Sequence, residues 1–351
     1  MKILHILDER WDSGLTAYGL AAARAMKQRG HDVWVAARPG LAAARQTEGF
    51  GFPVYPLEST LGLRRWIGQN EFHVVNAHTG AGHSAGFFAT RFKPTALVRT
   101  RGEARVVKPR PGQSLLFRET DGVVVASKAL GDVYDARFPF LMDRLSVIYP
   151  GVEVPAYTPP PPGPLRFGLL GRLDPVKGHD YLLQAIQLLA PRLTDQTFLV
   201  AGEDKKISKA ELERRVAQME LSPWIRFLGR VPDAGAFMDD CHAGIIASVD
   251  SEAVSRAALE WMARGRPLVA TAVGALPEMV LNGDNGYLVP PKNPGALART
   301  IGLLMDNAER RQKMGERARR LAETQFGLAV MGEKTEKAYD AAVAHRWRSF
   351  R

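Results

Sequence analysis

Residues 248–280 read SVDSEAVSRAALEWMARGRPLVATAVGALPEMV. This stretch decides the fold class, because it predicts the end of one strand, a tight loop, a helix from about Ser255 to Arg264 and a second strand over 266–273. A strand, a helix and a second strand in this order are typical of an α/β domain with a parallel sheet. In such open sheets, ligands bind at the edge formed by the carboxyl ends of the strands.

Two carboxylates in this stretch, Glu252 and Glu260, are candidate sugar ligands. If Glu252 precedes the helix and Glu260 lies about two turns inside it, both face the same edge of the sheet. Each carboxylate has two acceptor oxygens, which suit neighbouring hydroxyls of a sugar or a ribose. The loop residues Ala253, Val254 and Ser255 precede the helix, and their backbone N–H groups suit a phosphate. An isolated pair of glutamates is more often a solvated helix face, so the accompanying motifs decide between the two interpretations.

A second motif, GLLGRLDPVKGHDYLLQAI at 168–186, accompanies the first. Together with the run ALEWMARGRPLVATAVGALPEMVLNGDNGYLVPPKNPGALARTI that follows Glu252, it resembles the C-terminal signature of the group 1 retaining glycosyltransferases, which include bacterial lipopolysaccharide and glycolipid transferases. The resemblance implies the GT-B architecture, in which two doubly wound, Rossmann-like α/β domains face a cleft. It also implies that Glu252 contacts the donor sugar and Glu260 the ribose of the nucleotide.

Two cations, Arg172 and Lys177, follow the strand that the second motif predicts. Two positive side chains at the carboxyl end of a strand suit a diphosphate and would remove the need for a divalent metal. The sequence contains no Asp-x-Asp motif, so we expect neither a metal ion nor a cofactor. The resemblance assigns both cations to the pyrophosphate of a nucleotide sugar.

Length and composition predict two domains. The chain has 351 residues, of which 46% are hydrophobic, enough for two packed cores. The single cysteine, Cys241, excludes an intramolecular disulfide and a cysteine-rich metal site. No apolar run approaches the ~18 residues of a membrane span, and the start of the chain reads as a strand rather than a signal peptide. We therefore expect a cytoplasmic protein.

The domain boundary is expected at a proline-rich segment over 151–164, which contains VEVPAYTPPPPGP and predicts a stiff linker with a hinge. An acceptor-binding, Rossmann-like domain over 1–150 would precede it. A nucleotide-sugar-binding, Rossmann-like domain over 165–327 would follow it. The resemblance implies that the last helix, over 328–351, packs back on the first domain.

Three residues of the first domain are candidates for binding substrates. Gly14 follows the first predicted strand; the resemblance implies that its loop faces the donor phosphates and the acceptor, although the same glycine suits a simple turn. His78 ends a strand before a helix start rich in small residues, as in the family, where the acceptor binds. Arg101 stands near the position where many family members have a histidine. This departure puts a histidine-assisted step in doubt and favours guanidinium binding of an anionic acceptor or membrane.

The net charge of +10 restricts the partners. Residues 1–150 carry 20 Lys and Arg against 13 Asp and Glu, hence +7. A basic surface attracts anionic lipids, nucleic acids or phosphorylated acceptors. No nucleic-acid-binding motif accompanies the charge, so we expect no nucleic acid. We expect instead an anionic glycan or glycolipid acceptor and peripheral contact with the acidic surface of the inner membrane.

Three alternatives remain open at this point. Gly80, Gly82 and Ala85 form a G-x-G-x-x-A pattern with Glu103 about 20 residues further on, which is typical of NAD-dependent oxidoreductases. This turn does not open the domain, which counts against that function. A pair of glycosidase carboxylates is the second alternative, because the spacing of the two glutamates does not exclude it. A non-catalytic protein that binds sugar nucleotides or a membrane surface is the third.

The function that the sequence favours is transfer of a glycosyl group from a nucleotide sugar to an acceptor hydroxyl with retention at the anomeric carbon. The transition state of such a transfer resembles an oxocarbenium ion, and the diphosphate is the leaving group. Arg172, Lys177 and the loop amides at 253–255 would stabilise that leaving group, while Glu252 orients the sugar.

Overall fold

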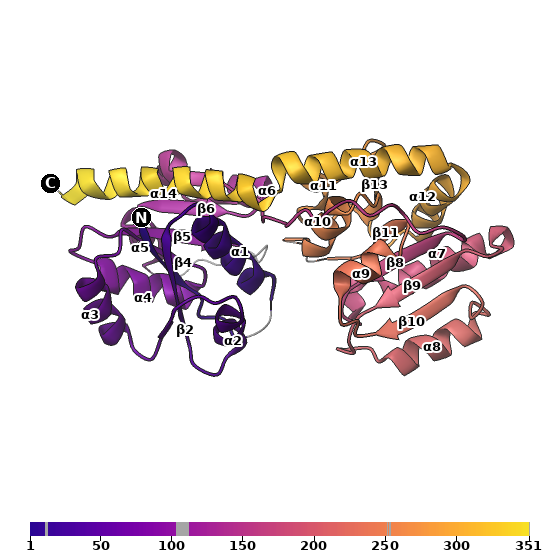
Figure 1. Ribbon diagram of the computed structural model, residues 1–351, viewed down its shortest axis with the longest axis horizontal. Coiled ribbons are helices and arrows are strands. Elements are labelled where there is room, and N and C mark those ends of the chain that lie inside the picture. Colours follow the sequence, from indigo (N-terminus) through magenta and orange to yellow (C-terminus); the bar gives the residue numbers. More distant parts are fainter. Residues whose placement is uncertain (11–12, 103–111, 251, 253, 351) are drawn as a thin grey trace. The chain divides into compact units, whose positions relative to one another are not determined.

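The structure is a computed structural model that describes residues 1–10, 13–102, 112–250, 252 and 254–350. The chain divides into two compact units (Figure 1). The first unit contains Met1–Gly151 and Phe326–Arg351, and the second contains Val152–Gln325. Each unit has its own sheet and its own core, and the two are described separately below.

The first unit is built on a seven-stranded sheet in which every strand pairing is parallel. The strand order is β3-β2-β1-β4-β5-β6-β7, so the order reverses between β1 and β4. The strands are β1 (Lys2–Ile6), β2 (Asp32–Ala37), β3 (Val54–Pro56), β4 (Val74–Ala77), β5 (Ala96–Arg101), β6 (Gly122–Val125) and β7 (Leu145–Val147).

Helices cover both faces of this sheet, as in a doubly wound domain. They are α1 (Gly14–Gln28), α2 (Ala42–Gly49), α3 (Thr60–Asn70), α4 (Gly80–Thr90), α5 (Gln113–Arg118), α6 (Lys128–Arg137), the 3₁₀ helix η1 (Pro139–Arg144) and α14 (Leu328–Phe350). α1 begins at Gly14, and the side chain of Ser13 caps it by accepting a hydrogen bond from the Thr16 amide.

The C-terminal helix α14 packs on α1, β5 and β6 of the first unit (Figure 1). Buried polar contacts fasten it: Asn76 Nδ2 on β4 donates to the Tyr339 hydroxyl at 2.6 Å, and the Asp121 carboxylate pairs with Arg346 at 2.9 Å. Asp121 also accepts from the backbone amide of Leu97 at 2.8 Å. The last helix therefore belongs to the core of the first unit although more than 170 residues separate it from β7.

The second unit has a six-stranded parallel sheet in the order β10-β9-β8-β11-β12-β13, which reverses between β8 and β11. Its strands are β8 (Arg166–Leu170), β9 (Thr197–Ala201), β10 (Ile225–Gly229), β11 (Ala243–Ile246), β12 (Leu268–Thr271) and β13 (Gly286–Val289). Its helices are η2 (Pro175–Lys177), α7 (His179–Leu189), η3 (Ala190–Arg192), α8 (Lys209–Gln218), α9 (Ala234–Asp239), α10 (Arg256–Ala263), α11 (Leu276–Met279), α12 (Pro294–Asp306) and α13 (Ala308–Gln325).

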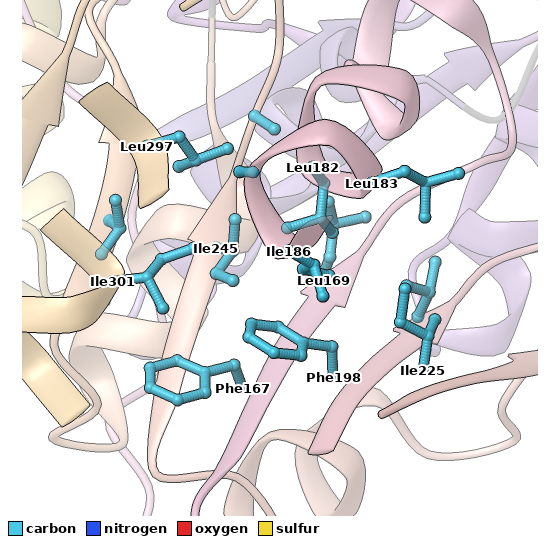
Figure 2. Close-up of a cluster of buried hydrophobic side chains, with 14 of the residues drawn as sticks. Phe167, Leu169, Leu182, Leu183, Ile186, Phe198, Ile225, Ile245, Leu297 and Ile301 are labelled. Carbon is cyan, nitrogen blue, oxygen red and sulfur yellow. The ribbon is translucent and has the colours of Figure 1, made fainter. Parts of the chain in front are cut away.

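A cluster of buried hydrophobic side chains packs β8 against the helices that cover it (Figure 2). Phe167 on β8 and Phe198 on β9 stack with their ring centroids 5.3 Å apart. Leu182 and Ile186 on α7 and Ile301 on α12 pack against these strands. The predicted pair of doubly wound α/β domains is confirmed by the two sheets.

The proline-rich segment differs from a free linker, since it is fastened to the second unit. The guanidinium of Arg266 is fully buried and donates to the carbonyls of Thr158 at 3.0 Å and Pro159 at 3.4 Å. Arg319 donates to the Pro155 carbonyl at 2.7 Å. Three carbonyls of the expected linker, those of Pro155, Thr158 and Pro159, are therefore bonded to side chains of the second unit.

Over the described residues, no helix combines the length and the apolar character needed to cross a membrane.

Candidate functional site

The loops at the carboxyl ends of β8 and β11 bring the predicted residues of the second unit together. Lys177 ends η2 after β8, and Glu252 lies in the loop between β11 and α10. β8 and β11 are the neighbouring strands at which the order of the sheet reverses. Such a switch point is where open α/β sheets bind ligands.

Glu252 is held there by two donors. Lys177 Nζ is 2.5 Å from Glu252 Oε1, and Ser248 Oγ donates to the same oxygen at 2.6 Å. Glu252 is 5% exposed, and the Lys177 side chain is 25% exposed. A carboxylate this buried is tolerated only when it is paired and hydrogen-bonded. The pair therefore fixes the carboxylate at a sheet edge, while the ammonium stays accessible from solvent.

Close backbone packing at two glycines explains why these loops meet. Gly178 has φ +71°, and a Cβ there would lie 1.9 Å from the carbonyl oxygen of Ala247. Gly274 has φ +58°, and a Cβ there would lie 2.3 Å from the carbonyl oxygen of Glu252. That same carbonyl accepts a hydrogen bond from the Ala275 amide at 2.8 Å. Only glycine combines the left-handed conformation with such an approach, so Gly178 packs against the end of β11 and Gly274 packs against the backbone of Glu252.

Glu260 and Arg172 are placed differently from this pair. Glu260 lies on α10, where Arg256 Nε donates to its Oε1 at 2.6 Å. Arg172 is exposed just after β8. Within the described part of the chain, no hydrogen bond or ion pair joins Arg172 to Glu252 or Glu260. Arg256 is a partner that the sequence did not predict, although its i,i+4 spacing from Glu260 was visible there.

The predicted phosphate loop is described in part. Ala253 lies outside the described residues. Ser255 precedes α10 as its N-cap, but its side chain does not cap the helix. Its Oγ is buried, and among the described residues it has no hydrogen-bond partner. A buried hydroxyl without a partner is unusual, and here it lies beside the helix start that was predicted to face phosphate.

His179 begins α7, two residues after Lys177, and is buried. Burial lowers the pKa of His179 from 6.5 to about 4, and the charge of Lys177 also acts in that direction. The ring is therefore neutral at pH 7. It adds no positive charge to the site.

The candidates of the first unit share one edge of the first sheet. Gly14 follows β1, His78 follows β4 and Arg101 ends β5, and these three strands are neighbours. Among the residues that the structure describes, none would lie within 4 Å of a side chain at Gly14, so they leave open space beside this backbone. The segment that follows Arg101 is also basic in sequence, with Arg105, Lys108 and Arg110, but these residues and Glu103 lie outside the described residues.

The interpretation of His78 as an acceptor ligand requires correction. His78 is 1% exposed, its Nε2 lies 2.9 Å from His5 Nδ1, and the two rings stack. Burial, with smaller contributions from His5 and Arg99, holds the pKa of His78 well below its ordinary value. A neutral, buried ring has no surface to offer an acceptor. The sequence pattern located the strand end but not the burial of its last side chain.

Arg99, two residues before Arg101 on β5, is placed differently from Arg101. It is buried, and its Nη1 donates to the carbonyls of Ala77 at 2.9 Å and Thr100 at 2.5 Å. Successive side chains of a strand point to opposite faces. Arg99 and Arg101, two positions apart, point to the same face, yet only Arg101 at the strand end is partly exposed.

The glycine turn of the NAD alternative has a packing role in the structure. A Cβ at Gly82 would lie 2.9 Å from Ile6 Cγ2, and one at Gly86 would lie 2.9 Å from Leu97 Cδ1. The Gly82 amide donates to Thr79 Oγ1, which caps α4. These glycines let α4 approach the sheet closely. Among the described residues, no group of three or more His, Cys, Asp or Glu side chains is placed to hold a metal ion.

Comparison with known families identifies the class. The model of the glycosyl transferases group 1 family matches residues 156–321, and that of Glycosyltransferase Family 4 matches residues 13–154. The two matches meet at the boundary between the units and together cover most of the chain. Both parts of the chain are therefore similar to glycosyltransferases, the first to Glycosyltransferase Family 4 and the second to the group 1 family.

Known relatives and structures agree with this class. The D-inositol 3-phosphate glycosyltransferase of Streptomyces coelicolor is 26% identical over 331 residues, which cover 80% of this chain and 72% of that protein. A glycosyltransferase from Rickettsia africae superposes with a TM-score of 0.86 at 20% identity, covering 97% of this chain and 98% of the other. The Anabaena protein HepE, solved in complex with UDP, has a TM-score of 0.81 at 20% identity, with 96% and 99% covered. The fold is GT-B, as predicted.

Proposed function

We propose that this glycosyltransferase transfers a sugar from a nucleotide-sugar donor to an acceptor hydroxyl with retention of anomeric configuration and without a divalent metal. The observation that carries the proposal is the pairing of Lys177 with Glu252 at the switch point of the second sheet. The pair presents an accessible cation for a diphosphate next to a fixed carboxylate for sugar hydroxyls. The second unit is thus the donor-binding unit in this proposal.

The roles of the site residues follow from their chemistry. Lys177 and the exposed Arg172 neutralise the departing diphosphate, the amides of 253–255 bind its oxygens, and Glu252 accepts hydrogen bonds from the sugar. Glu260 binds the ribose. Glu252 and Glu260 are each paired with a cation, which suits ionised acceptors better than the proton donor of a glycosidase.

The acceptor in this proposal is an anionic glycan or glycolipid bound by the first unit. The unit has open space beside Gly14 and a partly exposed Arg101 at neighbouring strand ends. Planar guanidinium groups bind phosphate and carboxylate in two-point geometry. The name of the Streptomyces coelicolor relative states an acceptor that carries a phosphate, which supports an anionic acceptor here. Assembly of lipopolysaccharide or another glycolipid is the corresponding process.

Contact with an acidic membrane surface has support in one face of the first unit, formed by the packed helices α3 and α4. Leu61 on α3, Phe88 on α4 and Phe92 just after α4 are exposed. The Arg91 guanidinium lies over the Phe92 ring at 5.1 Å from its centroid, and Arg64 donates to the Phe88 carbonyl at 2.6 Å. Phe92 has φ +61°, a conformation that bulky residues rarely adopt. Aromatic rings beside arginines suit the interface of an anionic bilayer.

The charge around this face agrees with a bilayer, because no Asp or Glu occurs between residues 72 and 102. In this proposal the chain works at the cytoplasmic surface of the inner membrane. Co-sedimentation with phosphatidylglycerol vesicles tests the contact, and we expect the double change Phe88→Ser and Phe92→Ser to weaken binding about tenfold. Leu188→Ser, a comparably exposed position of the second unit, is the matched control. Equal binding by all three proteins would contradict the contact.

A thermal shift assay tests the donor site. A ligand at 100 times its Kd stabilises a protein by about 2.7 kcal/mol, which this assay resolves. We expect one of UDP, GDP and ADP to raise the melting temperature equally in EDTA and in magnesium. Lys177→Ala and Glu260→Ala should abolish that rise, whereas Glu213→Ala, which removes an exposed partner of Lys209, should not. Stabilisation by NAD alone would contradict the proposal.

A product assay tests the stereochemistry. The proton NMR spectrum of the transferred sugar distinguishes the two anomers of the product. We expect the anomer of the donor to appear in the product. The opposite anomer would show inversion. That result would contradict the retaining mechanism but not the proposed donor site.

A further inference from the structure

We propose that Ser248 is a positioning residue that holds Glu252 for the donor sugar, so that it controls affinity for the sugar-bearing nucleotide but not for the free nucleoside diphosphate. This inference rests on the proposed function, because it assigns the partner of a residue in the donor site. Ser248 is the first residue of the stretch over 248–280, but the sequence pattern assigned it no role. It lies two residues beyond β11 and is buried.

The first step is the direction of the hydrogen bonds around Glu252. Ser248 Oγ donates at 2.6 Å and Lys177 Nζ at 2.5 Å, and both donors meet Oε1. Neither donor is directed at Oε2. A carboxylate held through one oxygen has a fixed plane, and its second oxygen then has a fixed direction. Such an oxygen accepts from a sugar hydroxyl at a lower entropic cost than a freely rotating carboxylate does.

The second step is that the position of Ser248 is itself fixed. Thr271 Oγ1, at the end of β12, donates to the Ser248 carbonyl at 2.6 Å. Thr271 is buried as well. A chain of hydrogen bonds therefore runs from β12 through Ser248 to Glu252, across neighbouring strands of the sheet. This chain ties the rotamer of one side chain to the rigid part of the domain.

The third step separates Ser248 from Lys177. A diphosphate attracts the Lys177 ammonium, whose flexible stem and partial exposure let it move toward that charge. The Ser248 hydroxyl is neutral and buried, so a diphosphate does not draw it away. When the donor binds, Ser248 is the partner that keeps Glu252 in place. Loss of the Ser248 hydroxyl should therefore weaken binding of the sugar, which Glu252 contacts, and not binding of the nucleotide.

The test compares two ligands that differ only by the sugar. Calorimetric Kd values for UDP and UDP-glucose, and for GDP and GDP-mannose, are measured on the wild-type protein, Ser248→Ala and Ser248→Thr. A hydrogen bond to a charged group changes affinity by about tenfold or more. We expect Ser248→Ala to weaken binding of the sugar nucleotide by about tenfold and binding of the diphosphate by less than twofold. Ser248→Thr, which retains the hydroxyl, should restore the affinity for the sugar nucleotide.

Ser208→Ala is the matched control, because it also removes a side-chain hydrogen bond from the second unit, at the N-cap of α8. It should leave both affinities unchanged. Equal weakening of both ligands by Ser248→Ala would show a merely structural role, and no weakening would show no role. If the wild-type protein binds ADP instead of UDP or GDP, ADP and ADP-glucose are the pair compared; if it binds none of the three diphosphates, the proposed function itself fails. If Ser248→Ala does not fold, Ser248→Cys, a weaker donor of similar size, gives the same comparison.

Discussion

Lys177 and Glu252 are 75 residues apart in the sequence and meet at 2.5 Å between two adjacent strand ends. Each side chain comes from a different loop. Gly178 beside Lys177 and Gly274 beside the Glu252 backbone allow these loops to pack closely, and a side chain at either glycine would be strained. Because the carboxylate is buried and the ammonium is not, the ion pair orients one group of the site and leaves the other free to move. The predictions below follow from this arrangement and from the packing that supports it.

Lys177→Ala should destabilise the second unit by about 2–3 kcal/mol, because it removes the cation that pairs with the buried Glu252 carboxylate. The Ser248 hydroxyl would then be the remaining donor to that carboxylate. Urea unfolding measures this change. Lys209→Ala, which removes a surface pair with Glu213 at 3.6 Å, should cost less than about 1 kcal/mol. Equal costs for the two variants would mean that Glu252 is solvated in the folded protein.

Gly274→Ala should disturb the site, and Gly283→Ala should not. Both glycines have a left-handed backbone, so both changes carry a strain of about 1 kcal/mol. Only at Gly274 would the new methyl group meet the carbonyl of Glu252, which adds about 2 kcal/mol of overpacking. Unfolding free energies give the difference. Loss of nucleotide-sugar binding should accompany Gly274→Ala alone, and an unchanged affinity in that variant would show that the loop yields without moving Glu252.

Tyr339→Phe should destabilise the first unit by about 1–3 kcal/mol, because the buried amide of Asn76 loses its acceptor. Tyr287→Phe is the control from the second unit. The Tyr287 hydroxyl is buried and has no partner among the described residues, so its removal should be neutral or slightly stabilising. Differential scanning calorimetry measures both. A neutral Tyr339→Phe would mean that apolar packing alone fastens α14.

Stability should fall with acidification between about pH 6.5 and pH 4, partly through His179. Burial lowers the pKa of the folded His179 to about 4, while the unfolded chain keeps the ordinary value of 6.5. Between these values the unfolded chain binds a proton that the folded chain does not, so protonation favours unfolding. The contribution above pH 6.5 is roughly 3 kcal/mol, and it is lost as the pH approaches 4.

Urea unfolding at pH 7.5, 5.5 and 4.5 measures this dependence. His179→Gln should show a shallower loss of stability on acidification than the wild-type protein, whatever its stability at neutral pH. The remaining slope should come from other buried histidines, such as His5, whose pKa burial lowers to about 3. Parallel pH profiles for the two proteins would contradict a buried, neutral His179.

The sequence predicted those parts of the site that local pattern determines. Alternating strands and helices placed Lys177 and Glu252 at strand ends of one sheet, and the structure has them there. Their direct contact was not predictable, because it depends on the strand order, which puts β8 beside β11. Ser248 was missed for the same reason: its donation to Glu252 is a property of the folded loop.

Burial is the second property that the sequence did not reveal. The pattern that placed His78 at a strand end is the same for a buried and an exposed side chain, and the structure buries it against His5. The proline-rich segment was predicted to be a stiff linker because its composition excludes helix and sheet. Its attachment depends on Arg266, an arginine that would ordinarily be expected at the surface but is buried here to bond the segment's carbonyls.

Hydrogen exchange with and without a bound nucleoside diphosphate tests the central claim most directly, because it locates the donor site on the chain. We expect protection of the loop over 171–178 and of the segment over 248–263, both in the second unit, and no protection of the turn and helix over 79–90 in the first. This pattern should be the same in EDTA and in magnesium. Protection confined to 79–90, or to no segment at all, would contradict a donor site built on Lys177 and Glu252.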